Sequence, residues 1–457
     1  MAKRNLYAAA LLALLLFVLS GCSLKSPEEL YTLPQPPEDY EHLQSAITLV
    51  QQQLNIQYST TVEYAAPLSG DNIQPVQLLD MNSDGIQESA VAFFRVTGAE
   101  NPLMIYIFRQ SEDGAYEVYA VIEGGGSSIT SVAYEELDNA PGKEFVVQWQ
   151  MNDDVHLLGA YSVAQDMVHP LLTTSYSNCQ VMDLDRDGLK EILLLQLDNA
   201  SASGTVEYYD YTADLDAFVL NSSAPISKGI SSISAVTDNY VSDMIPALYI
   251  TSVQAGTNLT GSGLITDIFV LSGDGLANIT LNPDTETSID TLRLKEIFGT
   301  DINNDSVVEL PFLTFLPEYG SPPSTNYWIT TWRQYDADGT AHSVYTTYHN
   351  ERSGWYLIIP DSWLGQLTIS RNEATNLGQR SATFYRWSGS NEEAPEPFLT
   401  IYRLTGTNRA VRASQGNRFI LLDDATTIYA AEFYGDWDCG LDKESLLENF
   451  NLIRTEW

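Results

Sequence analysis

Short apolar segments separated by polar turns recur along most of the chain. Residues 89–94, 192–196 and 310–315 are apolar or alternating runs, and each follows a segment rich in Asp, Asn and Ser. Runs of this length between turn residues are typical of β-strands, whereas an amphipathic helix needs a longer segment with apolar positions three and four residues apart. The pattern therefore predicts a mainly β protein.

Helical spacing appears at two places. The first segment opens with Glu38 and Asp39, and acidic residues favour the first turn of a helix. Its apolar positions, which we expect to pack on the sheets, are Tyr40, Leu43, Ile47, Val50 and Leu54. The second helix is expected to begin near Asp442, an N-cap residue type, with an apolar face formed by Leu446, Leu447 and Phe450.

Three acidic loops share one spacing. They read Asp80-Met-Asn82-Ser-Asp84-Gly85-Ile-Gln-Glu88, Asp183-Leu-Asp185-Arg-Asp187-Gly188-Leu-Lys-Glu191 and Asp301-Ile-Asn303-Asn-Asp305-Ser306-Val-Val-Glu309. When the first Asp is position 1, each loop carries oxygen side chains at positions 1, 3, 5 and 9. Such a turn can surround one hard cation, and calcium takes about six to eight oxygen ligands. The alternative is a set of plain hairpin turns, because Asp, Asn and Gly are common turn residues.

The residues around the loops distinguish between calcium architectures. An EF-hand needs a bidentate Glu at position 12 and a helix on each side, but position 12 is Val91, Leu194 and Phe312 in the three loops. Strand-like segments flank the loops instead. At this point the chain resembles the FG-GAP/VCBS-type repeats of integrin-like β-propellers, whose loops read D-x-D/N-x-D-G-x-x-D/E. The third loop departs from that pattern, since Ser306 stands at the Gly position.

The resemblance implies a β-propeller of about five to seven blades, with structural calcium in its inter-strand loops. We expect one strand from residues 55–78 to complete the last blade, because joining the first and last blades removes free sheet edges. Side-chain ligands are predicted at Asp80, Asn82, Asp84, Glu88, Asp183, Asp185, Asp187, Glu191, Asp301, Asn303, Asp305 and Glu309. Backbone carbonyl ligands are predicted at Ile86, Leu189 and Val307.

Two further segments look like decayed copies of the repeat. One runs from Asp138 to Glu144 with a loop two residues shorter, and the other begins at Asp238. Both have lost the alternate oxygens, so we interpret them as plain blade turns. The first aspartates then fall at 80, 138, 183, 238 and 301, at intervals of 58, 45, 55 and 63 residues, and a four-stranded propeller blade needs about 40–50 residues. Segments 107–114 and 331–339 also resemble each other, and both end in Asp-Gly, a hairpin signal.

The N-terminus predicts a membrane anchor. Residues 1–21 read as a signal peptide, because two basic residues precede a short apolar stretch. Leu19-Ser-Gly-Cys22 resembles the lipobox of bacterial lipoproteins, which implies cleavage before Cys22, lipidation of its thiol and attachment to the outer face of the bacterial cell membrane. Residues 22–37 would then form a proline-containing tether. The alternative is an ordinary signal peptide with a chance Cys.

The net charge limits the classes of binding partner, and the cysteine count limits the possible disulfides. The formal net charge of −38 argues against binding nucleic acid or an anionic membrane through a basic patch. With Cys22 lipidated, Cys179 and Cys439 remain, and they either pair or stay as two thiols.

A different pattern begins near residue 350. Strands are expected at 367–370, 382–387, 398–404, 418–422 and 427–433, before the C-terminal helix. The predicted organisation is therefore a signal peptide (1–21), a tether (22–37), a propeller with an N-terminal helix (38–350) and a small C-terminal α+β domain (351–457).

Catalytic patterns are scarce. The sequence contains no H-E-x-x-H, G-x-S-x-G or Walker motif. Trp149, Trp328, Trp332 and Trp387 would suit a sugar-stacking platform, and core packing is the alternative. The 60 acidic residues leave open a carboxylate pair for glycoside hydrolysis.

The sequence favours a lipid-anchored, calcium-stabilised binding or scaffold protein that recognises a protein or glycan ligand. The alternative is an exported propeller hydrolase that acts on polysaccharide or cell-wall glycan. Two carboxylates about 5–10 Å apart in a central pocket, away from the calcium loops, would favour the hydrolase.

Overall fold

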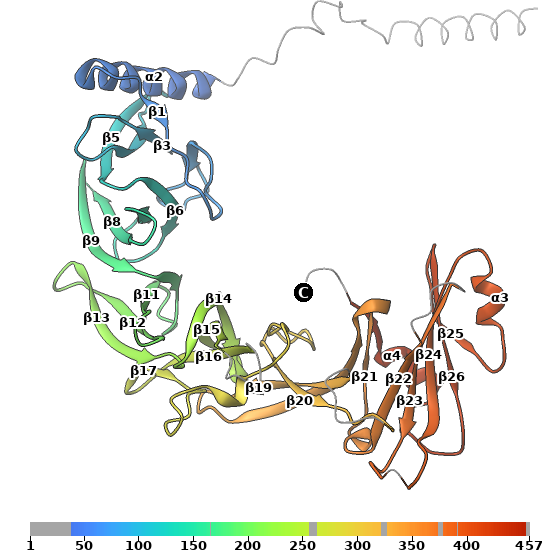
Figure 1. The fold of residues 1–457 in the computed structure, drawn as a ribbon. Helices are drawn as coiled ribbons and strands as arrows, with labels where there is room; N and C mark the ends of the chain where they lie inside the picture. Colours follow the sequence, from blue (N-terminus) through green and yellow to red (C-terminus); the bar gives the residue numbers. More distant parts are fainter. Residues whose placement is uncertain are drawn as a thin grey trace, which may run out of the picture. The chain divides into compact units, whose positions relative to one another are not determined.

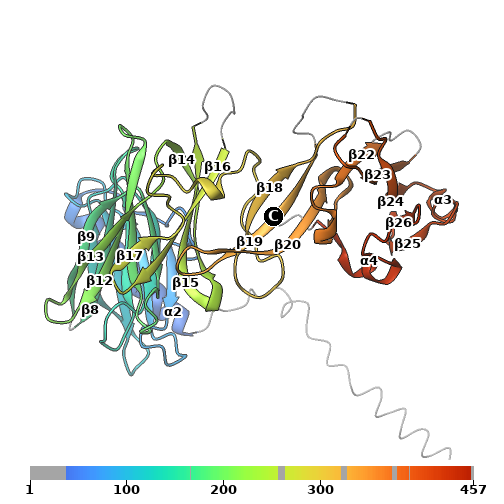
Figure 2. The ribbon, with the colours of Figure 1, turned by 90° about the horizontal axis from the view of Figure 1, so that it is seen from below.

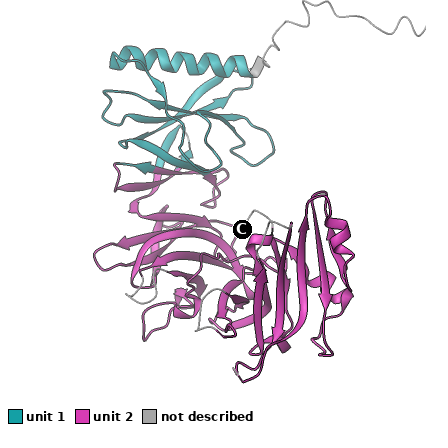
Figure 3. Ribbon diagram, turned by 45° about the vertical axis from the view of Figure 1, so that its right-hand side comes forward, with its two compact units in different colours: residues 1–133, 149–151, 162–169 teal, residues 134–148, 152–161, 170–457 magenta. Residues whose placement is uncertain are grey.

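The computed structural model describes residues 38–164, 166–255, 263–320, 327–372, 378–390 and 392–453. The predicted signal peptide 1–21, tether 22–37 and lipidation site Cys22 lie outside these ranges. Within them the chain is mainly β, as predicted, and its strands form six sheets (Figure 1). Figure 3 shows two compact units: one contains the residues up to 133 with 149–151 and 162–169, and the other contains the remaining residues.

Helix α2 (Glu38–Tyr58) is the predicted N-terminal helix. Leu43, Ile47, Val50 and Leu54 are 1–4% exposed and pack with residues of the first sheet, so four of the five predicted apolar contacts are confirmed. Tyr40 is 54% exposed, because it lies in the first turn of the helix, before the part that the sheet covers.

Sheet 1 has the order β1-β3-β4-β5, and β2 also pairs with β3. Its strands are β1 (Glu63–Tyr64), β2 (Val76–Leu79), β3 (Ser89–Arg95), β4 (Leu103–Gln110) and β5 (Tyr116–Gly124). Strands β1 and β2 therefore belong to the same sheet as β3. The expectation that a strand from residues 55–78 completes the last blade is therefore wrong, because both strands of this segment pair within the first sheet.

Three four-stranded sheets follow, each with its strands in chain order. Sheet 2 contains β6 (Ser128–Glu135), β7 (Glu144–Gln150), β8 (His156–Ala164) and β9 (Met167–Tyr176). Sheet 3 contains β10 (Asn178–Met182), β11 (Glu191–Asp198), β12 (Ser203–Thr212) and β13 (Ala217–Pro225). Sheet 4 contains β14 (Ile230–Val241), β15 (Ile245–Gln254), β16 (Gly263–Ser272) and β17 (Gly275–Asn278).

The last two sheets have five strands each. Sheet 5 contains β18 (Leu310–Phe315), β19 (Trp328–Tyr335), β20 (Ala341–Asn350), β21 (Trp355–Ile358) and the late strand β27 (Phe450–Leu452). Sheet 6 has the order β22-β23-β24-β26-β25. Its strands are β22 (Leu367–Asn372), β23 (Gln379–Arg386), β24 (Glu396–Thr405), β25 (Phe419–Asp423) and β26 (Thr427–Phe433). All six sheets are open in the part of the chain that the structure describes.

The helices of the C-terminal part are short. Helix α3 (Arg409–Ala413) packs on β24 and β26. Helix α4 (Lys443–Asn449) begins where it was predicted, because the Asp442 side chain accepts a hydrogen bond from the Ser445 N–H and caps the helix. The five strands predicted between residues 367 and 433 are also confirmed, with their ends shifted by a few residues.

The sheets of the second unit pack face to face, and β15 shows how. Its side chains alternate: Leu248 and Ile250 join the apolar core with sheet 3, whereas Ala247 and Tyr249 join a second core with Leu310 of sheet 5. A third core fills the space between sheets 5 and 6, which lie next to each other in Figure 2. Strands buried on both faces read as continuous apolar runs, and this explains the pattern in the sequence.

Candidate metal centres

The acidic side chains of the three predicted loops lie together in three clusters. Site 1 (residues 80–88) lies between β2 and β3, site 2 (183–191) between β10 and β11, and site 3 (301–309) directly before β18. In each site one carboxylate oxygen from every acid lies within 4.8 Å of the others. The clustered acids are Asp80, Asp84 and Glu88; Asp183, Asp185, Asp187 and Glu191; and Asp301, Asp305 and Glu309.

Backbone amides hold the loop carboxylates in place. In all three sites the N–H of position 5 donates to Oδ1 of position 3 at 3.0 Å. The N–H of position 7 donates to Oδ1 of position 5 at 2.8–2.9 Å. The N–H of position 6 donates to Oδ2 of the first Asp, in the pairs Gly85–Asp80 (2.7 Å), Gly188–Asp183 (3.2 Å) and Ser306–Asp301 (2.8 Å). The three loops therefore share one backbone conformation.

Two residues of each loop adopt positive φ. Position 4 has φ of 57°, 67° and 62° at Ser83, Arg186 and Asn304. At position 6, Gly85 and Gly188 have φ of 89° and 95°. Ser306 takes φ of 70° at the same position, so site 3 keeps the turn at the expense of a left-handed non-glycine residue, which costs about 1–2 kcal/mol.

The glutamate at position 9 is the buried member of sites 2 and 3. Glu191 and Glu309 are 2% and 0% exposed. Their Oε2 atoms accept hydrogen bonds from the N–H of position 2, from Leu184 at 2.6 Å and from Ile302 at 2.9 Å. Burial raises the pKa of Glu191 to about 8 and that of Glu309 to about 7, and the neighbouring loop carboxylates raise both further against the lowering effect of these hydrogen bonds.

Site 1 differs by one residue of strand register. Leu79 pairs with Ser89, whereas the equivalent residues of sites 2 and 3, Met182 and Thr300, pair with the glutamates at position 9. Glu88 is half-buried, and its Oε2 atom is buried without a hydrogen-bond partner. Buried polar atoms are rarely left without a partner, and a bound cation is one way to satisfy such an oxygen.

The donor set fits a hard divalent cation. Every predicted side-chain ligand offers oxygen, which calcium and magnesium prefer, and calcium tolerates irregular geometry at about 2.3–2.6 Å. Two like charges 4.8 Å apart repel by about 3–4 kcal/mol at an effective dielectric constant of about 20. A divalent ion would turn this repulsion into attraction. Metal ligation by these acids, by Asn82 and Asn303, and by the carbonyls of Ile86, Leu189 and Val307 stays a prediction.

Sequence reasoning missed residues on the second strand after the loop in sites 2 and 3. Gln334 of β19 donates from Nε2 to Oδ2 of Asp305 and to Oε1 of Glu309, both at 2.7 Å. At site 2, burial raises the pKa of Asp210 of β12, and the charges of the site 2 aspartates raise it further. The repeated Arg-Gln pair in segments 107–114 and 331–339 was the available signal, but it was interpreted only as part of a hairpin.

A fourth loop of the same length precedes β7. Glu144 accepts a hydrogen bond on Oε2 from the N–H of Leu137 at 2.9 Å, seven residues earlier, as the glutamates of sites 2 and 3 do. This bond aligns Glu136 with position 1 and Asp138 with position 3. It corrects the prediction that Asp138 starts a loop two residues shorter.

The fourth loop (residues 136–144) lacks two features of the sites. Ala140 stands at position 5, so the third oxygen side chain is missing. Pro141 stands at position 6 and cannot adopt positive φ. Asp138 still accepts a hydrogen bond from the N–H of Ala140 at 2.6 Å, and burial raises the pKa of Glu144 to about 7.

Asp238 does not lie in a loop. It lies within β14, where it pairs with Leu248, and its Oδ1 accepts a hydrogen bond from Nε2 of Gln180 at 3.0 Å. The connection from β14 to β15 is the short helical turn Ser242–Met244. The interpretation of Asp238 as the start of a blade turn is therefore wrong.

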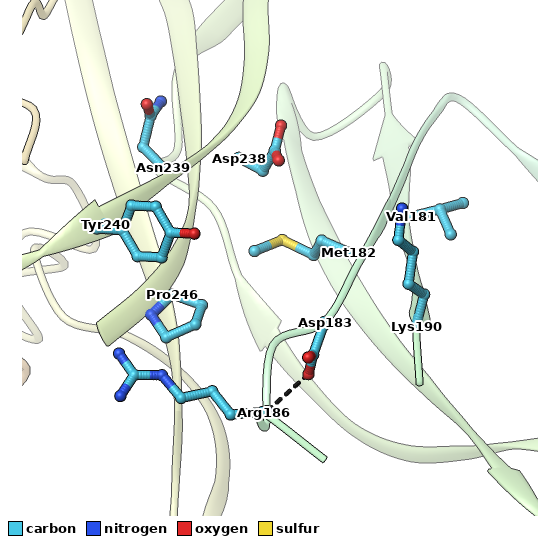
Figure 4. Close-up of a pocket in the computed structure, with 9 residues that line it drawn as sticks. All are labelled: Val181, Met182, Asp183, Arg186, Lys190, Asp238, Asn239, Tyr240 and Pro246. Atoms are coloured by element: carbon cyan, nitrogen blue, oxygen red, sulfur yellow. Dashed lines mark hydrogen bonds between the residues drawn. The ribbon is translucent and has the colours of Figure 1, made fainter. Parts of the chain in front are cut away.

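Site 2 borders a small polar pocket of about 250 Å³ (Figure 4). Asp183 belongs to both, and its Oδ1 accepts a hydrogen bond from the N–H of Arg186 at 2.7 Å. In Figure 4 the side chain of Arg186 extends towards Pro246 and away from that carboxylate. Tyr240, 40% exposed, also lines the pocket. An ion in site 2 would therefore lie at the edge of a pocket with aromatic and cationic groups.

Several other tryptophan, histidine and cysteine side chains that could carry chemistry pack within the fold or stay as free thiols. Trp149, Trp332 and Trp387 are 0–6% exposed, which favours core packing over a sugar-stacking platform for these three. His349 is half-buried and stacks on the ring of Tyr356, and its desolvation lowers its pKa to about 4. Cys179 and Cys439 are both free thiols.

No protein-family model matches this chain, and no curated protein matches it. Solved structures with some similarity include the β-propeller domain of the Trilobed protease from Pyrococcus furiosus, with 10% identity, a TM-score of 0.28, and coverage of 82% of this chain and 98% of that one. Another is an endo-arabinase from Bacteroides thetaiotaomicron, with 10% identity, a TM-score of 0.23, and coverage of 63% and 98%. A mannose phosphorylase from Leishmania mexicana has 11% identity, a TM-score of 0.24, and coverage of 66% and 90%. Similarities this distant carry no argument about function.

Within the described ranges, no helix combines the length and the apolar character that crossing a bilayer requires.

Proposed function

We propose that this chain is a calcium-stabilised binding or scaffold protein, held by a lipid on Cys22 at the outer face of a bacterial cell membrane. The observation that carries the calcium part is the recurrence of one oxygen-only loop, with the same backbone hydrogen bonds, at three places. The lipid anchor rests on the sequence pattern Leu19-Ser-Gly-Cys22 alone. The ligand is proposed to be a protein or a glycan.

The role of the ion is structural. Position 1 directly follows a strand in sites 1 and 2 and the bridge residue Thr300 in site 3. Position 9 is the first residue of the next strand in site 2 and directly precedes that strand in sites 1 and 3. An ion bound to both positions would fix the two strands relative to each other. It would also stabilise the ionised form of the buried Glu191 and Glu309, neither of which forms an ion pair with a lysine or arginine within the described ranges.

We further propose that the sheets are the blades of an open propeller. Sheets 2, 3 and 4 run in chain order, and the faces of sheets 3, 4 and 5 share apolar cores. Sites 1, 2 and 3 lead directly into strands β3, β11 and β18, so each site leads into a strand of sheet 1, 3 or 5. The pocket beside site 2 is the proposed contact point for a ligand, and the hydrolase alternative stays a prediction from the sequence.

Thermal unfolding of residues 23–457 tests the calcium proposal. We expect the melting temperature to rise between EDTA and millimolar calcium, because each ion adds about 1.4 kcal/mol at ten times its dissociation constant. The double variant Asp183→Ala, Asp187→Ala should lose at least a third of this increase. The matched control is Asp153→Ala, Asp154→Ala, which removes two exposed acids from the β7–β8 turn.

The control variant should respond to calcium as the unchanged chain does. If calcium shifts the melting temperature of no form of the chain, and the chain retains no calcium after dialysis, the loops are plain turns. The propeller proposal then loses its main support.

A further inference from the structure

The residue opposite position 9 occupies the same place in all three sites. Strand pairing puts Ser89 beside Arg109, Ile192 beside Tyr209 and Leu310 beside Arg333. One step back along the same registers places the three glutamates of position 9 beside Gln110, Asp210 and Gln334. Residues directly opposite each other in an antiparallel pair have their side chains on the same face, with Cβ atoms about 4.5–5.5 Å apart. The topology therefore brings one further oxygen-bearing side chain to each site.

Hydrogen bonds at site 3 show where the side chain opposite position 9, Gln334, lies. The amide nitrogen of Gln334 lies 2.7 Å from Oδ2 of Asp305 and 2.7 Å from Oε1 of Glu309. It thus bridges positions 5 and 9, and its N–H groups take the place that a cation would hold between two carboxylates. Rotation of the terminal amide by half a turn would present its oxygen to an ion at the same place, because the two ends of an amide have nearly the same shape.

Site 1 contains a buried carboxylate oxygen without a hydrogen-bond partner, Oε2 of Glu88. In site 2, Glu191 is 2% exposed, and its Oε2 accepts a hydrogen bond from the N–H of Leu184. The register of β11 with β12 places Asp210 directly opposite Glu191. The unpaired oxygen of Glu88 is an observation separate from the loop spacing.

We propose that Gln110, Asp210 and Gln334 are further ligands of the calcium ions in sites 1, 2 and 3. We also propose that the difference between the amide and carboxylate ligands sets the order of calcium affinity among the three sites. The inference rests on the proposed calcium function and extends it. Site 2 gains a fifth carboxylate from Asp210, whereas sites 1 and 3 each have three carboxylates and two amides. Calcium sites are tuned by the number of charged ligands. Site 2 is therefore the tight site, and sites 1 and 3 are weaker.

Calcium titration of the intact chain by isothermal calorimetry, with bound calcium counted by mass spectrometry of the dialysed protein, tests this inference. The unchanged chain should bind one ion more tightly than two others. Asp210→Asn should weaken the tight ion by about tenfold or more, as expected when one charged ligand becomes neutral. Asp214→Asn is the matched control, because it makes the same change in the exposed turn between β12 and β13.

At site 3 the opposite change can be tested, in which a neutral ligand becomes charged. Gln334→Glu should tighten one of the two weak ions, and Gln334→Met, which has a similar length but no oxygen ligand, should weaken it. Circular dichroism in EDTA checks that each variant is folded. If three ions bind but Asp210→Asn behaves as Asp214→Asn does, the fifth ligand is refuted while the calcium function stands. If the unchanged chain binds no calcium, both proposals fail together.

Discussion

Site 2 and the fourth loop are the same length and differ in the oxygen side chains that they carry. Both tie their last glutamate to a backbone N–H seven residues earlier, through the Glu191–Leu184 and Glu144–Leu137 bonds. They are also neighbours, since the N–H of Lys190 donates to the carbonyl of Glu136 at 2.9 Å. Only site 2 has an oxygen at position 5 and positive φ at position 6. The hydrogen bond to the last glutamate is therefore shared by both loops, whereas the features that would suit a cation lie at positions 5 and 6.

The largest expected effect concerns the buried glutamate at the end of the fourth loop. Burial raises the pKa of Glu144 to about 7, whereas an unfolded glutamate has a pKa near 4.5. Below the lower value both states are protonated. As pH rises to about 7 the unfolded state loses its proton first, so the folded state loses stability, by about 3 kcal/mol at most.

Glu144→Gln keeps an acceptor for the Leu137 N–H and removes this titration. In EDTA, the variant should gain stability relative to the unchanged chain between pH 5 and pH 8, measured as the free energy of unfolding in urea. Glu191 and Glu309 titrate in both proteins and cancel in the difference. A difference that stays constant with pH would show that Glu144 is not held protonated by burial.

The next effect would convert the fourth loop into a site. Ala140→Asp together with Pro141→Gly restores the missing oxygen and the missing positive φ. We expect a further bound calcium ion and a gain of about 1 kcal/mol in millimolar calcium. Ala140→Asp alone is the control, because Pro141 still prevents the turn. Equal calcium content in both variants and in the unchanged chain would mean that positions 5 and 6 do not explain the difference between the loops.

The smallest effect concerns the residue at position 6 of site 3. Ser306 has φ of 70°, which glycine adopts without a steric penalty. Ser306→Gly should relieve the strain, although the added freedom of the unfolded chain offsets part of the gain, so we expect less than about 1 kcal/mol. The gain should appear in EDTA as well as in calcium, in thermal unfolding. Gly188→Ala at the same position of site 2 should give the reverse change, since an added Cβ meets nothing within 4 Å there and only the backbone conformation is strained.

Local features of the fold could be predicted from the sequence, because their causes are local. The strands after each loop, helix α2, the capped helix α4 and the grouping of the loop acids all follow from spacing within a short segment. The position of Asp210 opposite Glu191 could not be predicted in this way, because it depends on the register of β11 with β12.

The fourth loop was misaligned for a related reason. Counting from the first aspartate, Asp138, gives a short loop, but the chain is aligned by its last glutamate, Glu144. The hydrogen bond between the Leu137 N–H and Glu144, and not the first aspartate, shows that Glu136 stands at position 1. Asp238 was misread because an aspartate followed by Asn resembles a turn, although strand β14 continues through it.

Strand β27 has a consequence for how the protein is made. Residues 450–452 pair with β21, so sheet 5 takes its fifth strand from a segment that is synthesised after the whole of sheet 6. A ribosome releases the chain from its N-terminus, so the edge of β21 stays uncovered while sheet 6 emerges. Sheet 5 gains its fifth strand only after sheet 6 has been released, and a chain that stops before residue 450 would leave this edge of β21 unpaired.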